Sequence, residues 1–319
     1  MKKPAAGGSA LALLAGAGLL ALPAVAAAAF PGRNGELVFA SNRGGLYDLY
    51  SLSAPGGSLR RLTHTRVVHE LDPAWSPDGK RLAYVRRSFA DENHPGPFEI
   101  WVMRADGRHA HFVARGKDPA WSPDGRRLAF TGPFTPRASR PEVYVMNADG
   151  SHKRRLTFNR RASDRSPSWS PDGRRIAYVS NFAGLSNGTR AIWVMRPDGS
   201  RKHRLTPVGN RTDSPDWSPD GKRIAFVRWP TVASAVTPRL WTMNAGGSNE
   251  QPLGDHPATG CSWAPDGQSI LFDGPPTPSS PTQDVFSVTL DGVTAVNLTA
   301  DAADDAGGVW RPLKRSRRG

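Results

Sequence analysis

Acidic residues stand at fixed positions ahead of four of the six tryptophans that recur along this chain. Five or three residues before a tryptophan, the carboxylates are Glu70, Asp72, Asp118, Asp164 and Asp305, and His69 adjoins the first of them. If they meet at one place, these carboxylates could bind an amine, a basic peptide segment or Ca²⁺, a cation that prefers hard oxygen ligands. Alternatively, each could accept hydrogen bonds from nearby backbone N–H groups. Two of the six repeats lack a carboxylate at both positions, which favours this second interpretation.

His69 is the residue that could act in catalysis. A histidine beside paired carboxylates can act as a general acid or base, so a secreted glycan lyase or hydrolase remains an alternative function. A second pair, His109 and His111, has no third metal ligand that we can place, and we expect it in a solvated turn. We therefore predict no catalytic residue and no cofactor, apart from the possible Ca²⁺.

A sequence unit repeated along the whole chain would position these side chains. DPAWSPDGKRLAYV at residues 72–85 returns in close copies from residues 118, 166 and 214 and in a degenerate copy from residue 260, and a last fragment starts at residue 307. The tryptophans that mark the copies are Trp75, Trp121, Trp169, Trp217, Trp263 and Trp310. Their spacings of 46, 48, 48, 46 and 47 residues are typical of a solenoid, a propeller or another repeat array.

Each repeat can be divided into four short strands. The first ends at the tryptophan, Pro-Asp-Gly makes a tight turn, and a second strand such as RLAYV alternates at period two. Third strands are predicted at residues 99–103, 142–146, 191–195, 239–243 and 284–288. After a second glycine turn, the fourth strand ends in Arg-Leu-Thr or a relic of it. Four strands with one tryptophan motif predict a propeller blade.

The two ends of the chain complete one blade. Residues 36–40, 46–52 and 59–63 supply a second, third and fourth strand, while residues 307–312 supply a first strand alone. Pairing the N-terminal strands with the C-terminal strand would close the ring and remove its exposed edges. We therefore predict an all-β fold, a six-bladed β-propeller of four-stranded blades.

The first 29 residues have the layout of a secretory signal peptide. Lys2 and Lys3 precede an apolar run at residues 11–22 and small residues at 24–26. The run is shorter than the roughly 20 residues of a spanning helix, so we expect cleavage, export to the periplasm, cell envelope or exterior, and no transmembrane segment in the mature chain. The propeller should then fill residues 30–313, with no separate catalytic domain, ahead of a basic tail at residues 314–319.

The charge of the protein is strongly positive. The formal net charge of +14 favours anionic partners such as acidic glycans, phosphate-bearing cell-wall polymers or lipid headgroups, and export makes nucleic acid an unexpected partner. Much of this charge comes in pairs after the Pro-Asp-Gly turns, such as Lys80 and Arg81, where strand ends are usually solvated. The single cysteine, Cys261, excludes an internal disulfide and is expected to be packed as a small apolar side chain.

The repeat resembles that of a known family. The element PxWSPDGxxIAFxS followed by IYVMxxDGSxxRxLT is similar to the TolB-type propeller repeat, a WD-like family, over residues 31–312. The resemblance implies a six-bladed, exported, non-enzymatic scaffold that binds a partner at one end of its central channel. We expect no counterpart here of the α/β domain that precedes the propeller in TolB, so a role in the Tol-Pal system does not follow.

Strand order assigns the loops to two faces. The turns after first and third strands are short and uniform, whereas those after second and fourth strands vary, for example at residues 86–97 and 181–189. Variable loops on a rigid scaffold are the usual place for recognition, so we expect the binding face there, with His69 and the carboxylates at its channel mouth. We expect a monomer that binds a protein or an anionic cell-envelope polymer.

Overall fold

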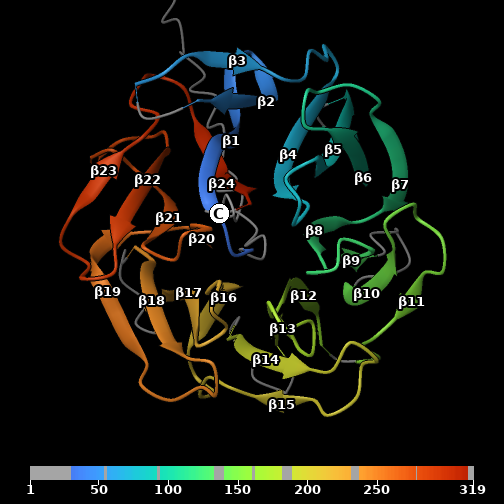
Figure 1. Ribbon diagram of the computed structural model, residues 1–319, viewed down its shortest axis with the longest axis vertical. Helices are drawn as coiled ribbons and strands as arrows, with labels where there is room; N and C mark the ends of the chain where they lie inside the picture. The colour runs from blue at the N-terminus through green and yellow to red at the C-terminus, as the bar shows by residue number, and fades with distance from the viewer. Residues whose placement is uncertain are drawn as a thin grey trace, which may run out of the picture.

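The computed structural model is a ring of six four-stranded antiparallel sheets (Figure 1). It describes residues 30–53, 56–91, 94–132, 140–159, 162–181, 189–230, 237–277 and 279–314. The predicted signal peptide and residues 315–319 of the predicted tail lie outside these ranges. Within them, no helix is long and apolar enough to cross a membrane. The predicted all-β, six-bladed propeller fold is confirmed.

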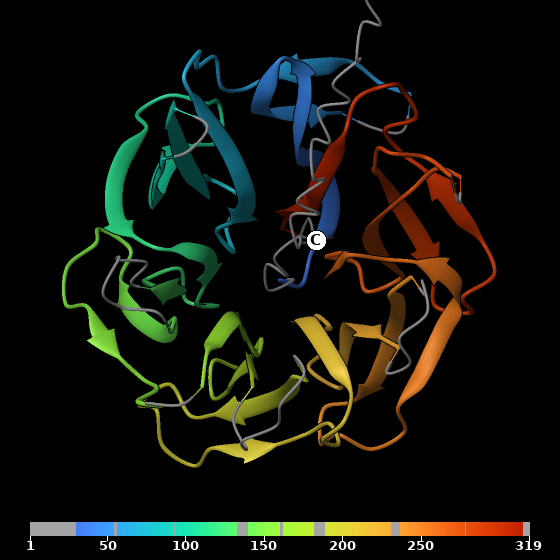
Figure 2. The same ribbon diagram turned by 180° about the vertical axis from the view of Figure 1, so that it is seen from behind.

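The blades share one strand order from the channel outward, and Figure 2 shows the same ring from behind. The innermost strands are β24 (Asp305–Leu313), β4 (Val68–Trp75), β8 (Lys117–Trp121), β12 (Asp164–Trp169), β16 (Arg211–Trp217) and β20 (Gly260–Trp263). The second strands are β1 (Arg33–Gly44), β5 (Arg81–Asp91), β9 (Arg127–Gly132), β13 (Ile176–Ser180), β17 (Arg223–Trp229) and β21 (Ser269–Gly274). The third strands are β2 (Leu46–Leu52), β6 (His94–Arg104), β10 (Glu142–Asn147), β14 (Ala191–Met195), β18 (Arg239–Asn244) and β22 (Asp284–Thr289). The outer strands are β3 (Leu59–Arg61), β7 (His111–Arg115), β11 (Arg154–Arg155), β15 (His203–Arg204), β19 (Gln251–Pro257) and β23 (Ala295–Asn297). We number the blades 1 to 6 in the order of their outer strands.

Blade 1 is assembled from both ends of the described chain. Its inner strand β24 pairs antiparallel with β1, so that Leu37 lies opposite Trp310 and Val38 opposite Val309. The other five blades each use four consecutive strands.

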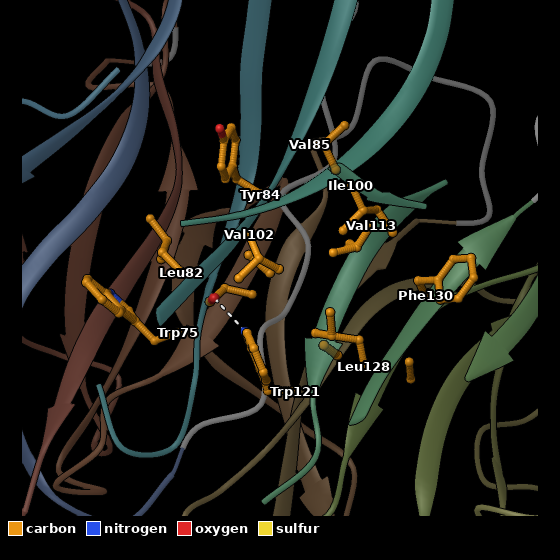
Figure 3. Close-up of a cluster of buried hydrophobic side chains, with 14 of the residues drawn as sticks. Trp75, Leu82, Tyr84, Val85, Ile100, Val102, Val113, Trp121, Leu128 and Phe130 are labelled. Carbon is orange, nitrogen blue, oxygen red and sulfur yellow. Dashed lines mark hydrogen bonds between the residues drawn. The ribbon is translucent and has the colours of Figure 1, made fainter. Parts of the chain in front are cut away.

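The repeated tryptophans form the packing between blades. Five of them are at least 97% buried, and only Trp310 is partly exposed. Trp121 in blade 3 packs among side chains of blade 2, and its indole N–H donates to the backbone oxygen of Ala74 at 3.0 Å (Figure 3). The guanidinium of Arg81 covers this indole, with 4.5 Å between the guanidinium carbon and the ring centroid.

The arginine and tryptophan contact recurs around the ring. The equivalent pairs are Arg127 over Trp169 at 4.9 Å, Arg175 over Trp217 at 4.4 Å and Arg223 over Trp263 at 5.0 Å. We interpreted both basic residues after each turn as solvated strand ends. This interpretation is wrong for the second residue of each pair, whose guanidinium joins its blade to the next.

The Pro-Asp-Gly turns are fixed by the serine that precedes them. The Ser76 hydroxyl donates to Asp78 Oδ1 at 2.7 Å and accepts the backbone N–H of Arg81 at 2.9 Å. Gly79 adopts a φ of +65°, which a residue with a side chain rarely takes. The same serine hydrogen bonds recur in blades 3, 4 and 5. The motif is therefore repeated because it fixes a tight turn within each of these blades.

The Leu-Thr end of the repeat closes the outer edge of four blades. The threonine hydroxyl accepts a backbone N–H of the third strand, from Leu49 to Thr63 at 2.8 Å and from Ile192 to Thr206 at 2.9 Å. Blades 3 and 6 repeat this bond at Thr157 and Thr299, both at 3.0 Å. The motif therefore has a structural role.

Cys261 is buried, and its thiol donates to the backbone oxygen of Ser214 in the neighbouring blade at 3.2 Å. Burial raises the pKa of this thiol well above its ordinary value. The side chain is thus an unreactive packing element.

Candidate functional site

A distortion in the inner strands sets the geometry of the channel wall. Three residues before the tryptophan, Asp72, Asp118, Ser166 and Ser214 have φ between 50° and 56°, a left-handed conformation that is uncommon outside glycine. The pairing with the second strand shifts register at the same point in these four blades. These β-bulges turn the backbone toward the next blade instead of the partner strand.

Asp118 uses this bulge to join two blades. Its Oδ2 accepts the Thr131 hydroxyl at 2.6 Å and the backbone N–H of Ser166, in blade 4, at 3.2 Å. Asp72 occupies the same position one blade earlier, and burial, reinforced by the nearby Asp118 carboxylate, raises its pKa to about 7. These two predicted site residues lie close together and hold the ring together.

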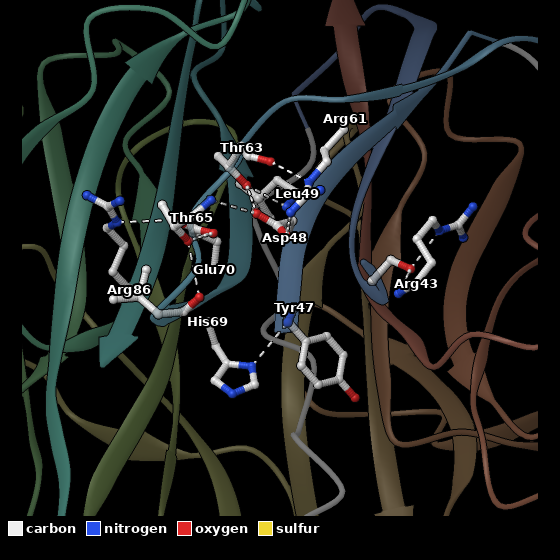
Figure 4. A network of polar contacts seen from close by, with 12 residues as sticks. Arg43, Tyr47, Asp48, Leu49, Arg61, Thr63, Thr65, His69, Glu70 and Arg86 are labelled. Carbon is white, nitrogen blue, oxygen red and sulfur yellow. Dashed lines mark hydrogen bonds and ion pairs between the residues drawn. The ribbon is translucent and has the colours of Figure 1, made fainter. Parts of the chain in front are cut away.

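The carboxylates five residues before the tryptophan are fully buried, and each has its own partners. Glu70 accepts the Thr65 hydroxyl at 2.9 Å and Arg86 Nε at 3.2 Å (Figure 4), and burial raises its pKa to about 7. Asp305 accepts two hydrogen bonds from Arg43 Nη2, at 2.9 and 3.1 Å, and burial raises its pKa to about 6.

Asp164 completes this set in blade 4. It accepts the Asn159 side-chain amide at 2.6 Å, and burial raises its pKa. The structure therefore places Glu70, Asp164 and Asp305 in separate hydrogen-bond networks. It brings Asp72 and Asp118 close to each other. In the described part of the chain, no three His, Cys, Asp or Glu side chains are grouped so that they could hold a metal ion. The Ca²⁺ site stays a prediction.

His69 lies at the seam between blades 1 and 2. Its Nδ1 accepts the backbone N–H of Tyr47 at 3.2 Å, and the two rings are 5.5 Å apart (Figure 4). Burial and the nearby Arg87 lower its pKa, which keeps the ring neutral. Since Nδ1 is occupied as an acceptor, the neutral ring carries its proton on Nε2, where it can donate but cannot accept a proton. Tyr47 donates its hydroxyl to Asp304, and burial raises its pKa well above the ordinary value.

Sequence reasoning missed the partners of these residues. Asp48 at the start of a third strand pairs with Arg61 of Arg-Leu-Thr, and Glu142 pairs with Arg155 in the same way (Figure 4 shows the first pair). Both pairs are 13 residues apart, and Asn297 replaces the arginine opposite Asp284 at the same separation. This recurrent spacing is a signal that could have found them.

The loop-rich face carries a pocket beside this seam. The cavity of about 580 Å³ is lined by Gly44, Gly45, Leu46, Arg61, His64, Thr65 and Arg66. Val67 follows directly and is 69% exposed. Phe158, 69% exposed, and Val208, 44% exposed, occupy the same connection from fourth strand to next blade elsewhere in the ring. Three exposed apolar side chains therefore lie on the face that we predicted to bind.

One catalytic pattern in the sequence was overlooked. GLSNG at residues 184–188 has the glycine and serine spacing of a nucleophile elbow. The pentapeptide falls outside the described residues. A nucleophile elbow needs a helix after the serine, whereas here the chain continues into strand β14.

The fold and its wall of inter-blade contacts define a six-bladed β-propeller with a loop-rich face. The family model of the TolB β-propeller domain matches residues 68–314, and the chain belongs to this family. A protein TolB homolog of Chlorobium luteolum is 34% identical over 125 residues, which is 39% of this chain and 27% of that relative. The chain thus matches little more than a quarter of that relative's length.

Solved structures share the fold. TolB from Acinetobacter baumannii superposes with a TM-score of 0.70 at 22% identity, covering 87% of this chain and 67% of that one. An oligogalacturonate lyase from Vibrio parahaemolyticus superposes with a TM-score of 0.54 at 15% identity, covering 83% of this chain and 90% of the lyase. Both likenesses show the architecture alone, which serves many functions.

Proposed function

We propose that this chain is an exported, monomeric, non-enzymatic binding propeller that holds a protein partner at the loop-side channel mouth. The observation that carries the proposal is the exposure of Val67, Phe158 and Val208 in equivalent connections of one face. Exposed apolar side chains at equivalent points of one face can serve as contact points for a protein partner. Family membership and the resemblance to TolB support a binding role.

The chemistry of the pocket indicates what the partner offers. Arg66 and His64 are exposed beside Val67, and Arg61 is already paired with the buried Asp48. A segment that combines an apolar residue with flanking carboxylates would fit this surface. The positive charge of the protein would speed the approach of such a partner.

The alternative of a glycan lyase has less support. The single acceptor nitrogen of His69 is occupied, and the predicted carboxylates are engaged in hydrogen bonds or ion pairs between elements of the ring. The fold shared with oligogalacturonate lyase is compatible with either function.

Photo-crosslinking from the exposed valines would test the binding role. A photoreactive residue at position 67 should give a defined adduct in a cell-envelope fraction of the source organism, and an acidic segment added in excess should suppress it. Position 293 is the matched control, since Val293 is 79% exposed but lies in a turn after a third strand, on the opposite face. Equal adducts from both positions, or none from position 67, would refute the proposal.

Two further measurements separate the remaining parts of the proposal. Fractionation of cells that express the chain with and without residues 1–29 tests export. Release of unsaturated products from polygalacturonate, lost in His69→Ala, would replace the binding role by the lyase function.

A further inference from the structure

We propose that the turn face carries a phosphate-binding site between blades 3 and 4, formed by four arginines. A pocket of about 580 Å³ is lined there by Arg127, Arg154, Arg174 and Arg196, with Pro197 and Asp198. The arginines come from strand β9, strand β11, the Pro-Asp-Gly turn of blade 4 and the turn after β14, all in two blades that are neighbours in the ring of Figure 1. This face is opposite the loop-rich face, so the site is independent of the proposed protein-binding role.

Two of the arginines are held in place by the protein. Arg154 donates from Nη1 to the backbone oxygen of Asp198 and from Nη2 to that of Pro197, both at 2.9 Å. Arg127 lies over the indole of Trp169 at 4.9 Å. Half of the site is therefore preorganised, which reduces the entropy cost of binding.

The charge of this pocket is not neutralised by ion pairs. Arginines elsewhere in the ring, such as Arg61 and Arg86, pair with buried carboxylates. Within the described ranges, none of the four pocket arginines forms an ion pair, and Arg174 and Arg196 are exposed to solvent. Asp198 is the one carboxylate of the lining; its Oδ1 accepts the backbone N–H of Ser200 at 2.8 Å, and the nearby Arg196 and Arg154 help to lower its pKa, so it offsets one of the four positive charges. A surplus of positive charge remains for a ligand.

The repeats provide an internal control for this cluster. At the equivalent four positions, the interface of blades 2 and 3 has Arg81, His111, Arg126 and Asn147. The interface of blades 4 and 5 has Arg175, His203, Lys222 and Asn244. The interface of blades 5 and 6 has Arg223, Gln251, Gln268 and Thr289. The scaffold thus tolerates neutral residues at three of the four positions, so packing alone does not explain four arginines at one interface.

The arrangement suits a phosphate group better than a carboxylate. A phosphate monoester carries close to two negative charges at neutral pH and offers oxygens in several directions. A carboxylate carries one charge and offers two oxygens in one plane. Guanidinium groups that converge from four elements can donate to several phosphate oxygens in pairs.

Calorimetric titration with inorganic pyrophosphate at low ionic strength tests the site. The variant R174Q/R196Q should weaken binding by on the order of ten-fold, since each charged hydrogen bond contributes measurably to affinity. The variant R104Q/K222Q removes the same charge from exposed turn positions of other interfaces and should retain binding within about two-fold. Circular dichroism checks that both variants are folded.

A second arm identifies the source of the phosphate. Binding to pyrophosphate and also to phosphatidylcholine vesicles that contain phosphatidic acid would assign a lipid headgroup, and binding to pyrophosphate alone would assign a soluble phosphate; both support the site. No heat with millimolar pyrophosphate, equal weakening in both variants, or tighter binding of trigalacturonate than of pyrophosphate would overturn it.

Discussion

The guanidinium of Arg81 in blade 2 lies 4.5 Å from the indole centroid of Trp121 in blade 3, and its Nη2 donates to the backbone oxygen of Gly125 at 2.8 Å. The second strand of one blade thereby binds both the inner strand and the tight turn of the next. Because the contact recurs in the following three blades, it is a repeated contact that joins neighbouring blades of the ring.

Replacement of Arg81 by alanine should destabilise the protein by about 1 to 2 kcal/mol. The change removes a half-buried cation–π contact, a hydrogen bond to a backbone oxygen and the cover over Trp121. Lys80→Ala, one residue away and exposed, is the control and should change the unfolding free energy by less than about 0.5 kcal/mol. Urea unfolding followed by tryptophan fluorescence measures both. Equal effects would show that the stacked arginine contributes nothing.

Thr206→Val should cost about 1 to 3 kcal/mol of unfolding free energy. The buried backbone N–H of Ile192 loses its hydroxyl acceptor, while the size of the side chain is kept. Thr206→Ser retains the hydroxyl and should remain close to the wild type in denaturant titrations. A valine variant as stable as the serine variant would contradict the role assigned to the threonine of Arg-Leu-Thr.

Arg43→Met should be strongly destabilising at neutral pH, by about 3 kcal/mol, because Asp305 would remain buried without its cation. The loss should shrink in the double variant R43M/D305N, which removes the unpaired charge. Thermal unfolding of the two variants provides the comparison. A double variant that is no more stable than R43M would locate the effect outside the ion pair.

Asp273 should make the protein less stable as the pH rises. Burial, reinforced by Asp304 and Asp305, raises its folded-state pKa to about 7 from its ordinary value of 3.8, although the backbone N–H groups of Gly307 and Gly308 donate to it. The folded state thus binds the proton more tightly, so this stability is present below about pH 4 and is lost as the pH rises through about 7.

The variant Asp273→Asn tests this linkage. Its melting temperature should fall less than that of the wild type between about pH 5 and about pH 8. Asp106→Asn is the control, since this exposed carboxyl has a lowered pKa and titrates below that range. An unchanged slope in Asp273→Asn would show that the buried carboxyl does not titrate there.

The blades could be predicted because their signals are local. Pro-Asp-Gly fixes a turn within five residues, and the alternating strand beside it needs no distant partner to be identified. The third strands at residues 142–146 and 284–288 lie within β10 and β22 for this reason.

The partners of the site residues could not be predicted because they depend on how blades meet. Asp118 was expected to bond within its own entry turn, yet its oxygen accepts the N–H of Ser166 in the next blade. Both residues have a positive φ, which a single sequence does not specify at aspartate or serine. The arginine stacking was missed for the same reason.

The pairing of β1 with β24 in blade 1 has a consequence for biosynthesis. Arg43 and Asp305 meet across 262 positions of sequence, and β1 has no inner neighbour before β24 exists. During synthesis, β1 therefore presents an open sheet edge until β24 has been made. Contacts of such sequence separation form slowly, because the intervening chain must first be ordered. Closure of the ring is thus a late folding step, and the interval before it is when the chain is most exposed to aggregation.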